Sequence, residues 1–290
     1  MLDLAQPANG YIILGDNAEV LAKLPGRSFQ LIYIDPPFNT GRAQRRLTLF
    51  THQSEEGDRR GFGGRNYATT LAGRKSFDDD FDDYMGFIRP RLIEARRLLT
   101  EDGTLYFHID YREAHYCKVA LDAIFGRECF LNEVIWAYDY GGRPKRRWPA
   151  KHDTILVYTR DPERYYFDQG AVERLPYMAP GLVTPDKAAR GKAPTDVWWH
   201  TIVPTSGREK TGYPSQKPEG ILRRVVQASS APGAWVLDFF AGSGTTGAVA
   251  RQLGRRFVLV DDNPEALEVM RRRLGTEGIS YITSCGERLF

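Results

Sequence analysis

Cysteine is scarce in this chain, with three residues among 290. They form no Cys-x-x-Cys pair, which argues against a disulfide framework or a zinc site, and we expect no bound metal. No run approaches the roughly eighteen apolar residues that span a bilayer. The first ten residues also lack the basic start and apolar stretch of a secretory signal. The sequence therefore predicts a cytoplasmic protein without a membrane segment.

Basic residues are clustered in this chain, although its net charge of +3 is small. Between positions 42 and 75, eight basic residues stand against three acidic ones. A second cluster, interrupted by a tryptophan, consists of Arg143, Lys145, Arg146, Arg147 and Lys151. Basic segments with interleaved aromatic residues suit a phosphate backbone and unstacked bases. A solvated surface loop explains either cluster equally well when it is taken alone.

Strand-like and helix-like segments alternate along the chain, which predicts an α/β fold with a mainly parallel sheet. With 42% hydrophobic residues the chain can bury a large core. The strand candidates are 11–14, 31–34, 104–109, 133–138, 154–159, 235–239 and 256–260. The helix candidates are 17–23, 84–99, 112–125, 218–229, 244–253 and 264–274.

Two long segments interrupt this alternation. Residues 41–80 are rich in Gly, Arg and Thr and show little periodicity, and residues 139–194 are rich in Pro, Arg and Tyr. Long irregular segments inside a compact fold are typically functional loops or inserted recognition elements. We expect irregular structure in both.

The strand candidate 31–34 ends in the string Asp35-Pro36-Pro37-Phe38. Two prolines fix the local backbone, so the flanking carbonyl oxygens and side chains are held in one arrangement. Asp35 and a proline carbonyl can each accept one hydrogen of an exocyclic NH2 group, while Phe38 stacks on the ring that carries it. A nucleobase fits this description.

A second candidate site is a glycine-rich turn between the strand at 235–239 and the helix that follows it. Gly242 and Gly244 allow a ligand to approach the backbone closely, and free amides at a helix start suit electron-rich groups. Asp261 ends the next strand, where a carboxylate can accept both hydroxyls of a ribose. Helix capping also explains Asp261, and a tight strand-to-helix turn also explains the glycines. Because Gly-x-Gly-x-x-Gly fits a dinucleotide fingerprint, a nicotinamide enzyme remains an alternative.

The combination of the two motifs is more informative than either one. An Asp-Pro-Pro-aromatic string should occur by chance in about one chain in several hundred of this length, and a dehydrogenase has no use for it. In one parallel sheet both loops would open at the carboxyl ends of strands, where such folds bind ligands. One loop would hold a nucleoside cofactor and the other a base.

These residues resemble the amino-directed DNA methyltransferases that use S-adenosylmethionine. Asp35 to Phe38 resembles the family's catalytic motif, and Phe240-Ala241-Gly242-Ser243-Gly244 its cofactor motif. Their order is that of the β group. The resemblance implies a circularly permuted Rossmann-like methyltransferase fold with a mainly parallel, seven-stranded sheet. It also implies a catalytic half at 1–138 with an insertion at about 41–80, a target-recognition region at 139–199, and a cofactor-binding half at 200–290.

The resemblance also assigns roles to individual residues. The target amine would be held by Asp35 and the Pro36 carbonyl, beside Pro37, and the base would stack on Phe38. The expected cofactor-binding residues are Asp16, Lys217, Pro218, Asp238, Phe240, Gly242, Gly244, Thr245 and Asp261. The expected DNA contacts are Arg143, Arg146, Arg147 and Lys151.

Some positions have competing explanations or depart from the family pattern. Asp16 could be a helix N-cap, and Lys217 could be exposed ahead of a helix that begins at Pro218. Tyr213 stands where the family commonly has histidine, and Asp262 stands at a position that is usually apolar. We expect the lone His108 to be structural.

The resemblance predicts methylation of double-stranded DNA at an exocyclic amine, adenine N6 in the first place because aspartate opens the catalytic motif. Cytosine N4 is the alternative, since it presents nearly the same amine. A nicotinamide oxidoreductase and a non-catalytic DNA-binding regulator on the same scaffold stay in view. A cognate restriction endonuclease and a second copy of the chain are candidate partners.

Overall fold

The computed structural model describes Leu4 and residues 8–39, 44–53, 59–60, 66–77, 81–204 and 207–290. The chain forms two compact units, one of Met1–Pro36 with Met85–Phe290 and one of Pro37–Tyr84. In the described part of the chain no helix has the length and apolar character that a membrane span requires.

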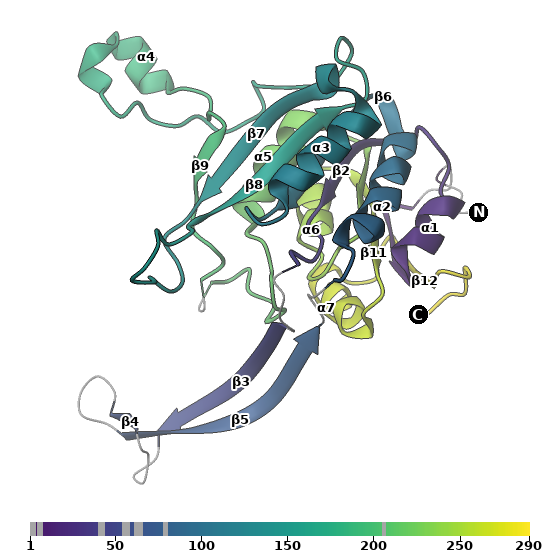
Figure 1. The fold of residues 1–290 in the computed structure, drawn as a ribbon, viewed down its shortest axis with the longest axis vertical. Coiled ribbons are helices and arrows are strands. Elements are labelled where there is room, and N and C mark those ends of the chain that lie inside the picture. The colour runs from purple at the N-terminus through teal and green to yellow at the C-terminus, as the bar shows by residue number, and fades with distance from the viewer. Residues whose placement is uncertain are drawn as a thin grey trace. The chain divides into compact units, whose positions relative to one another are not determined.

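The larger unit is built on a nine-stranded sheet in the order β12-β1-β11-β10-β2-β6-β8-β7-β9 (Figure 1). The strands are β1 (Gly10–Leu14), β2 (Phe29–Ile34), β6 (Leu99–Ile109), β7 (Phe130–Ala137), β8 (His152–Thr159), β9 (Val197–Trp199), β10 (Trp235–Asp238), β11 (Arg256–Asp261) and β12 (Ile279–Thr283). All seven predicted strands lie in this sheet, and the predicted α/β fold is confirmed. The two additional strands, β9 and β12, form its edges.

Strand direction places the ends of the predicted motif strands at one edge. From β12 to β6 every neighbouring pair is parallel, whereas β8 runs antiparallel to both β6 and β7. The segments after β1, β2, β6, β7, β10 and β11 therefore all begin at the same edge of the sheet, which we call the carboxyl edge. Because the chain leaves β2 toward β6 but leaves β10 toward β11, the topological switch point lies between β2 and β10.

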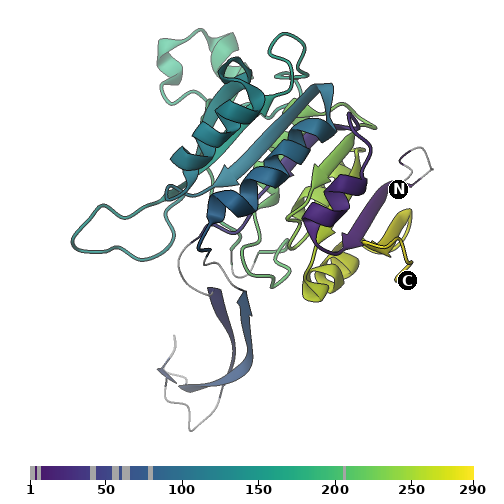
Figure 2. The ribbon, with the colours of Figure 1, turned by 45° about the vertical axis from the view of Figure 1, so that its right-hand side comes forward.

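Helices cover both faces of the sheet (Figures 1 and 2). One face carries α1 (Asn17–Lys23), α2 (Tyr84–Leu98) and α3 (Ala114–Phe125), and the other carries α5 (Glu219–Ser229), α6 (Thr245–Gln252) and α7 (Pro264–Leu274). All six were predicted. Their apolar spacing explains this, since in α2 the side chains of Ile88, Leu92 and Ala95 are fully buried. The short α4 (Pro185–Arg190) was missed because it buries no residue.

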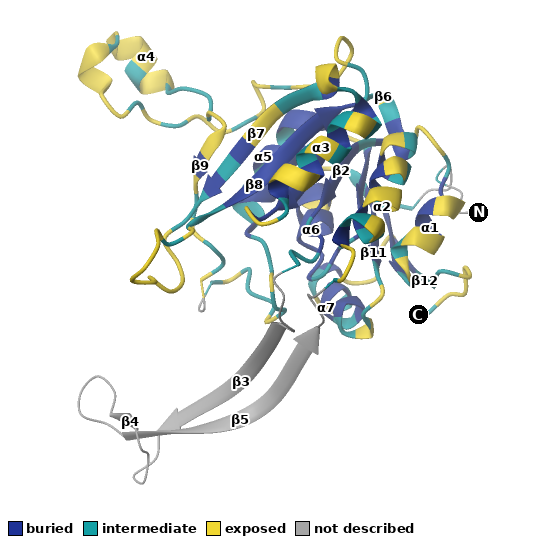
Figure 3. Ribbon diagram, in the orientation of Figure 1, coloured by how far each residue is buried: buried dark blue, intermediate teal, exposed yellow. Residues whose placement is uncertain are grey.

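The core lies between the sheet and these helices, and the strands at its centre are buried on both faces (Figure 3). On the α5 side the strand residues Leu31, Val236 and Leu259 pack with Val225 and Val249 of the helices. Central strands of this kind read as short, almost continuous apolar runs, which made them visible in the sequence.

The smaller unit contains a three-stranded sheet of β3 (Gln44–Gln53), β5 (Asn66–Phe77) and β4 (Arg59–Arg60). β3 pairs antiparallel with β5 from Gln44, opposite Phe77, to Gln53, opposite Tyr67. Our expectation of irregular structure in residues 41–80 is therefore wrong for the part that is described. Residues 41–80 show no clean two-residue period in the sequence, and the pairing of β3 with β5 itself contains a register shift between Thr48 and Leu49.

Candidate active site

Asp35 begins the segment after β2, at the carboxyl edge of the sheet, and its side chain is 14% exposed. Its Oδ2 atom forms an ion pair with the Lys217 ammonium. Its Oδ1 atom is buried and has no hydrogen-bond partner among the described residues. A buried carboxylate oxygen without a donor is costly, so this atom is suited to take a hydrogen from a ligand.

Lys217 connects the two predicted motifs, which are far apart in the sequence. Its ammonium contacts Asp35, 182 positions away, and its backbone carbonyl accepts a hydrogen bond of 3.2 Å from the Thr245 hydroxyl at the start of α6. The sequence predicted a cofactor contact for Lys217. Its pairing with Asp35 was not foreseen, because nothing in the linear sequence relates the two positions.

A buried polar chain lies behind Asp35. The Tyr33 hydroxyl is 2.7 Å from His108 Nδ1, and His108 Nε2 is 3.2 Å from Asp153 Oδ2. The Tyr138 hydroxyl donates to the other oxygen of Asp153 at 2.9 Å. We expected His108 to be structural, but its Nδ1 atom lies only 3.7 Å from Asp35 Oδ1.

The glycine-rich turn follows β10, the strand adjacent to β2. Gly242 and Gly244 have φ angles of 49° and 70°, in the left-handed region that disfavours side chains. A Cβ atom on Gly244 would lie 2.7 Å from Met270 Cγ, and one on Gly242 would lie 3.2 Å from the Tyr213 ring. The turn itself therefore requires these glycines, and their predicted contact with a ligand stays a prediction.

The buried Asp238 carboxyl group and the partly buried Asp261 carboxyl group hold this turn in place. Asp238 accepts hydrogen bonds from the Phe240 amide at 3.0 Å and the Thr246 hydroxyl at 2.6 Å. Asp261 accepts from the Gly242 amide at 2.7 Å and the Asn263 amide at 3.0 Å. Burial is the main cause that raises the pKa of Asp238 to about 7 and that of Asp261 to about 6.

The remaining predicted cofactor residues lie at the same edge. Asp16 caps α1 by accepting from the Ala18 and Glu19 amides at 2.8 and 3.2 Å, and Arg91 pairs with it at 3.4 Å. The capping explanation for Asp16 is thus what the structure shows, and its predicted contact with the cofactor stays a prediction. Phe240 follows β10, and Pro218 is the N-cap residue of α5.

These residues fit a nucleoside cofactor with a methionine tail. A glycine turn leads into a helix of which Thr245 is the first residue, and the Asp261 carboxyl group lies at the end of the neighbouring strand β11. Such a carboxylate suits ribose hydroxyls, while a tight turn lets an elongated ligand approach the backbone. The residues present are thus compatible with S-adenosylmethionine.

The predicted DNA contacts lie on the hairpin loop between β7 and β8, residues 138–151, which begins at the carboxyl edge. Arg146, Arg147 and Trp148 are exposed, Trp148 to 94%. Arg143 instead pairs with Asp139 at 2.6 Å, and Lys151 donates to the Tyr140 and Gly141 carbonyls at 2.5 and 2.8 Å. The loop thus combines exposed cations with an exposed aromatic ring, and it uses its other cations to hold its own shape.

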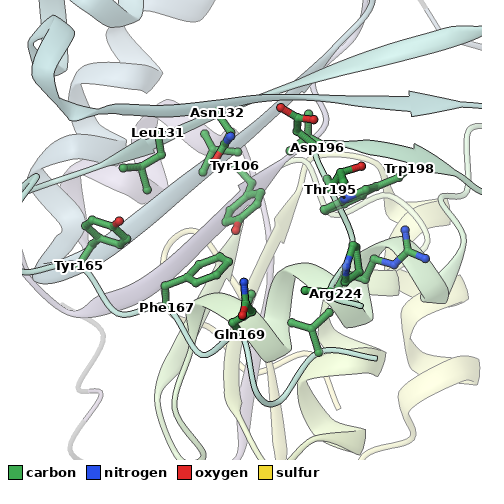
Figure 4. A pocket seen from close by; sticks show the side chains of 16 residues that line it. Tyr106, Leu131, Asn132, Tyr165, Phe167, Gln169, Thr195, Asp196, Trp198 and Arg224 are labelled. Carbon is green, nitrogen blue, oxygen red and sulfur yellow. Dashed lines mark hydrogen bonds between the residues drawn. The ribbon is translucent and has the colours of Figure 1, made fainter. Parts of the chain in front are cut away.

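A separate cavity of about 500 Å³ lies on the α5 side of the sheet (Figure 4). In Figure 4 Trp198 and Arg224 lie on one side of it, and Tyr165 and Phe167 on another. Arg224 pairs with Glu173 at 2.5 Å. None of the predicted site residues lines this cavity, which is formed by the start of β7, the segment before β9 and residues 165–172.

Comparison with known proteins gives the family. A family model described as DNA methylase matches residues 29–272. The chain is 30% identical over 271 residues to the DNA adenine methyltransferase YhdJ of Escherichia coli (strain K12), covering 91% of this chain and 82% of that protein. It is 29% identical over 268 residues to the type II methyltransferase M.HpaI of Haemophilus parainfluenzae, covering 92% and 74%.

Solved structures share the fold at lower identity. The cytosine-N4-specific PvuII DNA methyltransferase superposes with a TM-score of 0.63 at 15% identity, covering 94% of this chain and 90% of that one. M1.HpyAVI, in complex with SAM, superposes with a TM-score of 0.57 at 17% identity, covering 92% and 99%. From the matched family model and the extent of the similarity, this chain belongs to the DNA methylase family and is a DNA methyltransferase that uses S-adenosylmethionine.

Proposed function

We propose that this protein transfers the methyl group of S-adenosylmethionine to the exocyclic amine of a base turned out of the DNA duplex, with adenine N6 as the target. The observation that carries the proposal is Asp35. One of its oxygens is fixed by Lys217, and the other is buried without a hydrogen-bond partner among the described residues. It stands on the strand next to the glycine turn, so an acceptor for an amine adjoins the cofactor residues.

The chemistry requires an amine that is made more nucleophilic. The lone pair of an aromatic amine is delocalised into the ring. Acceptors on both hydrogens, the Asp35 carboxylate and the Pro36 carbonyl, favour a tetrahedral nitrogen whose lone pair is localised. The bound cofactor supplies an electrophilic methyl group on a sulfonium. Asp35 also stabilises the positive charge that develops on nitrogen, and it need not act as a general base.

Cofactor binding is proposed for the residues of the glycine turn and their neighbours. The ribose hydroxyls would donate to Asp261, and Gly242 and Gly244 would bring backbone close to the methionine part. Asp16 lies close to Asp261, since the Gly15 amide donates to the Asp261 carbonyl at 3.0 Å, and this supports a role for Asp16 toward the adenine. Lys217 and Pro218 would line the methionine pocket.

Phe38 is proposed to stack on the everted base and so to offset part of the few kcal/mol that base eversion costs. It follows Asp35 by three residues and belongs to the smaller unit. Phe38→Ala should weaken capture of the everted base, whereas Phe38→Trp should retain activity because it preserves an aromatic face. Equal turnover by the wild type and the alanine variant would exclude this role.

Adenine is favoured over cytosine by the aspartate in the catalytic motif and by the similarity to a relative named as an adenine methyltransferase, which is 30% identical. The cytosine-N4-specific neighbour is 15% identical. Cytosine N4 is therefore the second candidate.

The test is to incubate the protein with duplex DNA and S-adenosylmethionine labelled on its methyl group, digest the DNA to nucleosides and identify the labelled one. We expect N6-methyladenine. Labelled N4-methylcytosine would support the second candidate, and DNA that is bound but unlabelled would support a non-catalytic regulator. Reduced-cofactor turnover in place of labelling would indicate an oxidoreductase.

The recognition region, the location and the partners of the protein are proposed from its DNA methyltransferase activity. Residues 139–199 would be the target-recognition region, because they carry the exposed basic and aromatic loop. A DNA substrate fits a cytoplasmic protein. A cognate restriction endonuclease and a homodimer are proposed partners, which co-purification and sedimentation of the full chain would detect.

A further inference from the structure

His108 is fully buried directly behind Asp35. Its Nδ1 atom is 2.7 Å from the Tyr33 hydroxyl and 3.7 Å from Asp35 Oδ1, and its Nε2 atom is 3.2 Å from Asp153 Oδ2. The Trp136 ring packs edge-on against the imidazole at 5.6 Å. Because these partners come from β2, β7 and β8, neighbouring strands fix the imidazole in one orientation.

Asp153 determines which ring nitrogen of His108 carries the hydrogen. Burial raises the pKa of Asp153, but contacts with His108, Lys217 and Tyr138 lower it, and the net pKa lies below the ordinary value. The ionised carboxylate only accepts hydrogen bonds, so Nε2 of His108 must donate to it. In the neutral imidazole Nδ1 is then an acceptor, and the Tyr33 hydroxyl donates to it.

We propose that His108 is a positioning residue for methyl transfer. In its neutral form His108 leaves Asp35 Oδ1 available to accept a hydrogen from the target amine. In its protonated form it forms an ion pair with that oxygen. A hydrogen on Nδ1 would replace the one that the Tyr33 hydroxyl donates to this atom at 2.7 Å. Asp35 Oδ1 lies 3.7 Å from the same nitrogen, and the attraction between imidazolium and carboxylate draws the two together. The amine must then compete for its acceptor. The inference rests on the proposed role of Asp35.

The other titratable groups around the imidazole are assigned different roles. Asp35 and Asp153 lie beside the imidazole as carboxyl groups, and the Lys217 ammonium is held on Asp35. Tyr33 and Tyr138 stay protonated, because burial is the largest cause that raises the pKa of each hydroxyl. Histidine ordinarily changes charge between about pH 5 and 8. Asp238, whose pKa burial raises to about 7, also interacts with Asp35, so a His108 variant is needed to separate the two groups.

The first test compares the wild type with His108→Gln in single-turnover methyl transfer, at saturating S-adenosylmethionine and DNA, from pH 5.5 to 8.5. The glutamine amide can accept from Tyr33 and donate to Asp153 but cannot gain a proton. We expect the wild-type rate to fall about fivefold or more below pH 7, and the glutamine rate to change less than about twofold over the range. If the transfer rates of both proteins fall by the same factor at acid pH, the proposal is overturned.

The second test changes the group that fixes the tautomer. In Asp153→Asn an amide can donate to His108 Nε2, which moves the hydrogen to Nδ1 and toward Asp35. Asp153→Asn should therefore slow transfer about tenfold or more at pH 7.5 when His108 is present, but less than about threefold in the His108→Gln background. A merely structural role of Asp153 predicts that Asp153→Asn slows transfer equally with and without His108. That result would contradict the proposal.

Wild-type transfer at pH 7.5 tests the proposed function independently of this inference. If the wild type methylates DNA and its acid profile matches that of His108→Gln, the role of His108 is wrong and that of Asp35 is unaffected. If the wild type labels no DNA at pH 7.5, the proposed function fails first.

Discussion

At the scale of single residues, Asp261 should govern how cofactor binding depends on pH. Burial raises its pKa to about 6, and the amides of Gly242 and Asn263 only partly oppose this. Ribose hydroxyls would donate to the ionised carboxylate, so protonation must weaken binding. We expect the affinity for S-adenosylmethionine to fall about tenfold from pH 7 to pH 5, measured by calorimetry.

Two variants make this measurement specific. Asp261→Asn should bind more weakly than the wild type at pH 7 and show little dependence on pH. Asp262→Asn removes an exposed neighbouring carboxylate that helps to raise the pKa of Asp261, so it should keep the loss of affinity in acid but move it to somewhat lower pH. A wild-type affinity that is constant from pH 5 to 7 would exclude the proposed ribose contact.

Local motifs in the sequence are enough to single out Asp35 and the glycines of the turn as candidate site residues, and their roles remain proposals. The contacts of Lys217 and His108 could not be predicted. Lys217 meets Asp35 across 182 positions, and His108 meets Tyr33 and Asp153 only because β2, β6 and β8 are neighbours in the sheet. Sheet order, and not any local pattern, brings these side chains together.

At the scale of elements, the loop at 138–151 should carry the salt dependence of DNA binding. Arg146 and Arg147 are exposed cations at the carboxyl edge. Replacing both by glutamine should reduce the slope of log K against log salt by about 1.8, because each phosphate contact contributes about 0.9. Arg27→Gln is the matched control, since Arg27 is 65% exposed and precedes β2 at the opposite edge. An unchanged slope in the double variant would contradict the assignment.

Arg224 of α5 should anchor the segment around Glu173 to the core of the larger unit. Its side chain is 8% exposed, it pairs with Glu173 at 2.5 Å, and it lies over the Trp198 ring. We expect Arg224→Ala to lower the free energy of unfolding by about 1 to 3 kcal/mol. Arg223→Ala, its half-exposed neighbour, should change it by less than about 0.5 kcal/mol. An equal loss of unfolding free energy in the two variants, measured by chemical denaturation, would show that the Arg224–Glu173 pair does not anchor this segment.

Helices and strands could be predicted from the sequence where burial of one face or of a whole segment gives a regular spacing of apolar residues. The apolar positions of α2 and the buried run of β2 follow directly from packing. The three residues of β9 are too few to show alternation, α4 buries nothing, and the pairing of β3 with β5 contains a register shift. These elements depend on pairing with other strands or on local turns, which leave little trace in hydrophobicity.

At the scale of the whole molecule, two buried carboxyl groups should make the cofactor-free protein more stable in mild acid. The pKa of Asp238 is raised to about 7 and that of Asp261 to about 6 by burial, against about 3.9 for an aspartate in an unfolded chain. The folded state therefore binds more protons between about pH 4 and 7. The contribution of these groups is complete below about pH 4 and is lost as the pH rises through 6 and 7.

Denaturant unfolding between pH 5 and 8 measures this contribution. The drop in the free energy of unfolding over this range should be smaller in Asp238→Asn than in the wild type. If the two proteins lose the same amount, Asp238 is ionised in the folded state and its pKa is not raised.

The architecture explains why the two sites meet. The switch point between β2 and β10 is where parallel α/β sheets bind ligands. Here the segment that begins with Asp35, the proposed catalytic loop, follows one strand, and the glycine turn, the proposed cofactor site, follows the other. Lys217 joins them through its ammonium and its carbonyl. The order of the motifs along the chain is unimportant for this convergence, because only the order of strands in the sheet matters.

The most direct measurement of the central claim is single-turnover transfer of a labelled methyl group to DNA by Asp35→Ala, with cofactor and DNA binding measured on the same preparation. The account predicts that transfer falls by about a thousandfold or more, while both binding affinities stay within about threefold of the wild type. Transfer by Asp35→Ala at a rate close to that of the wild type would contradict it.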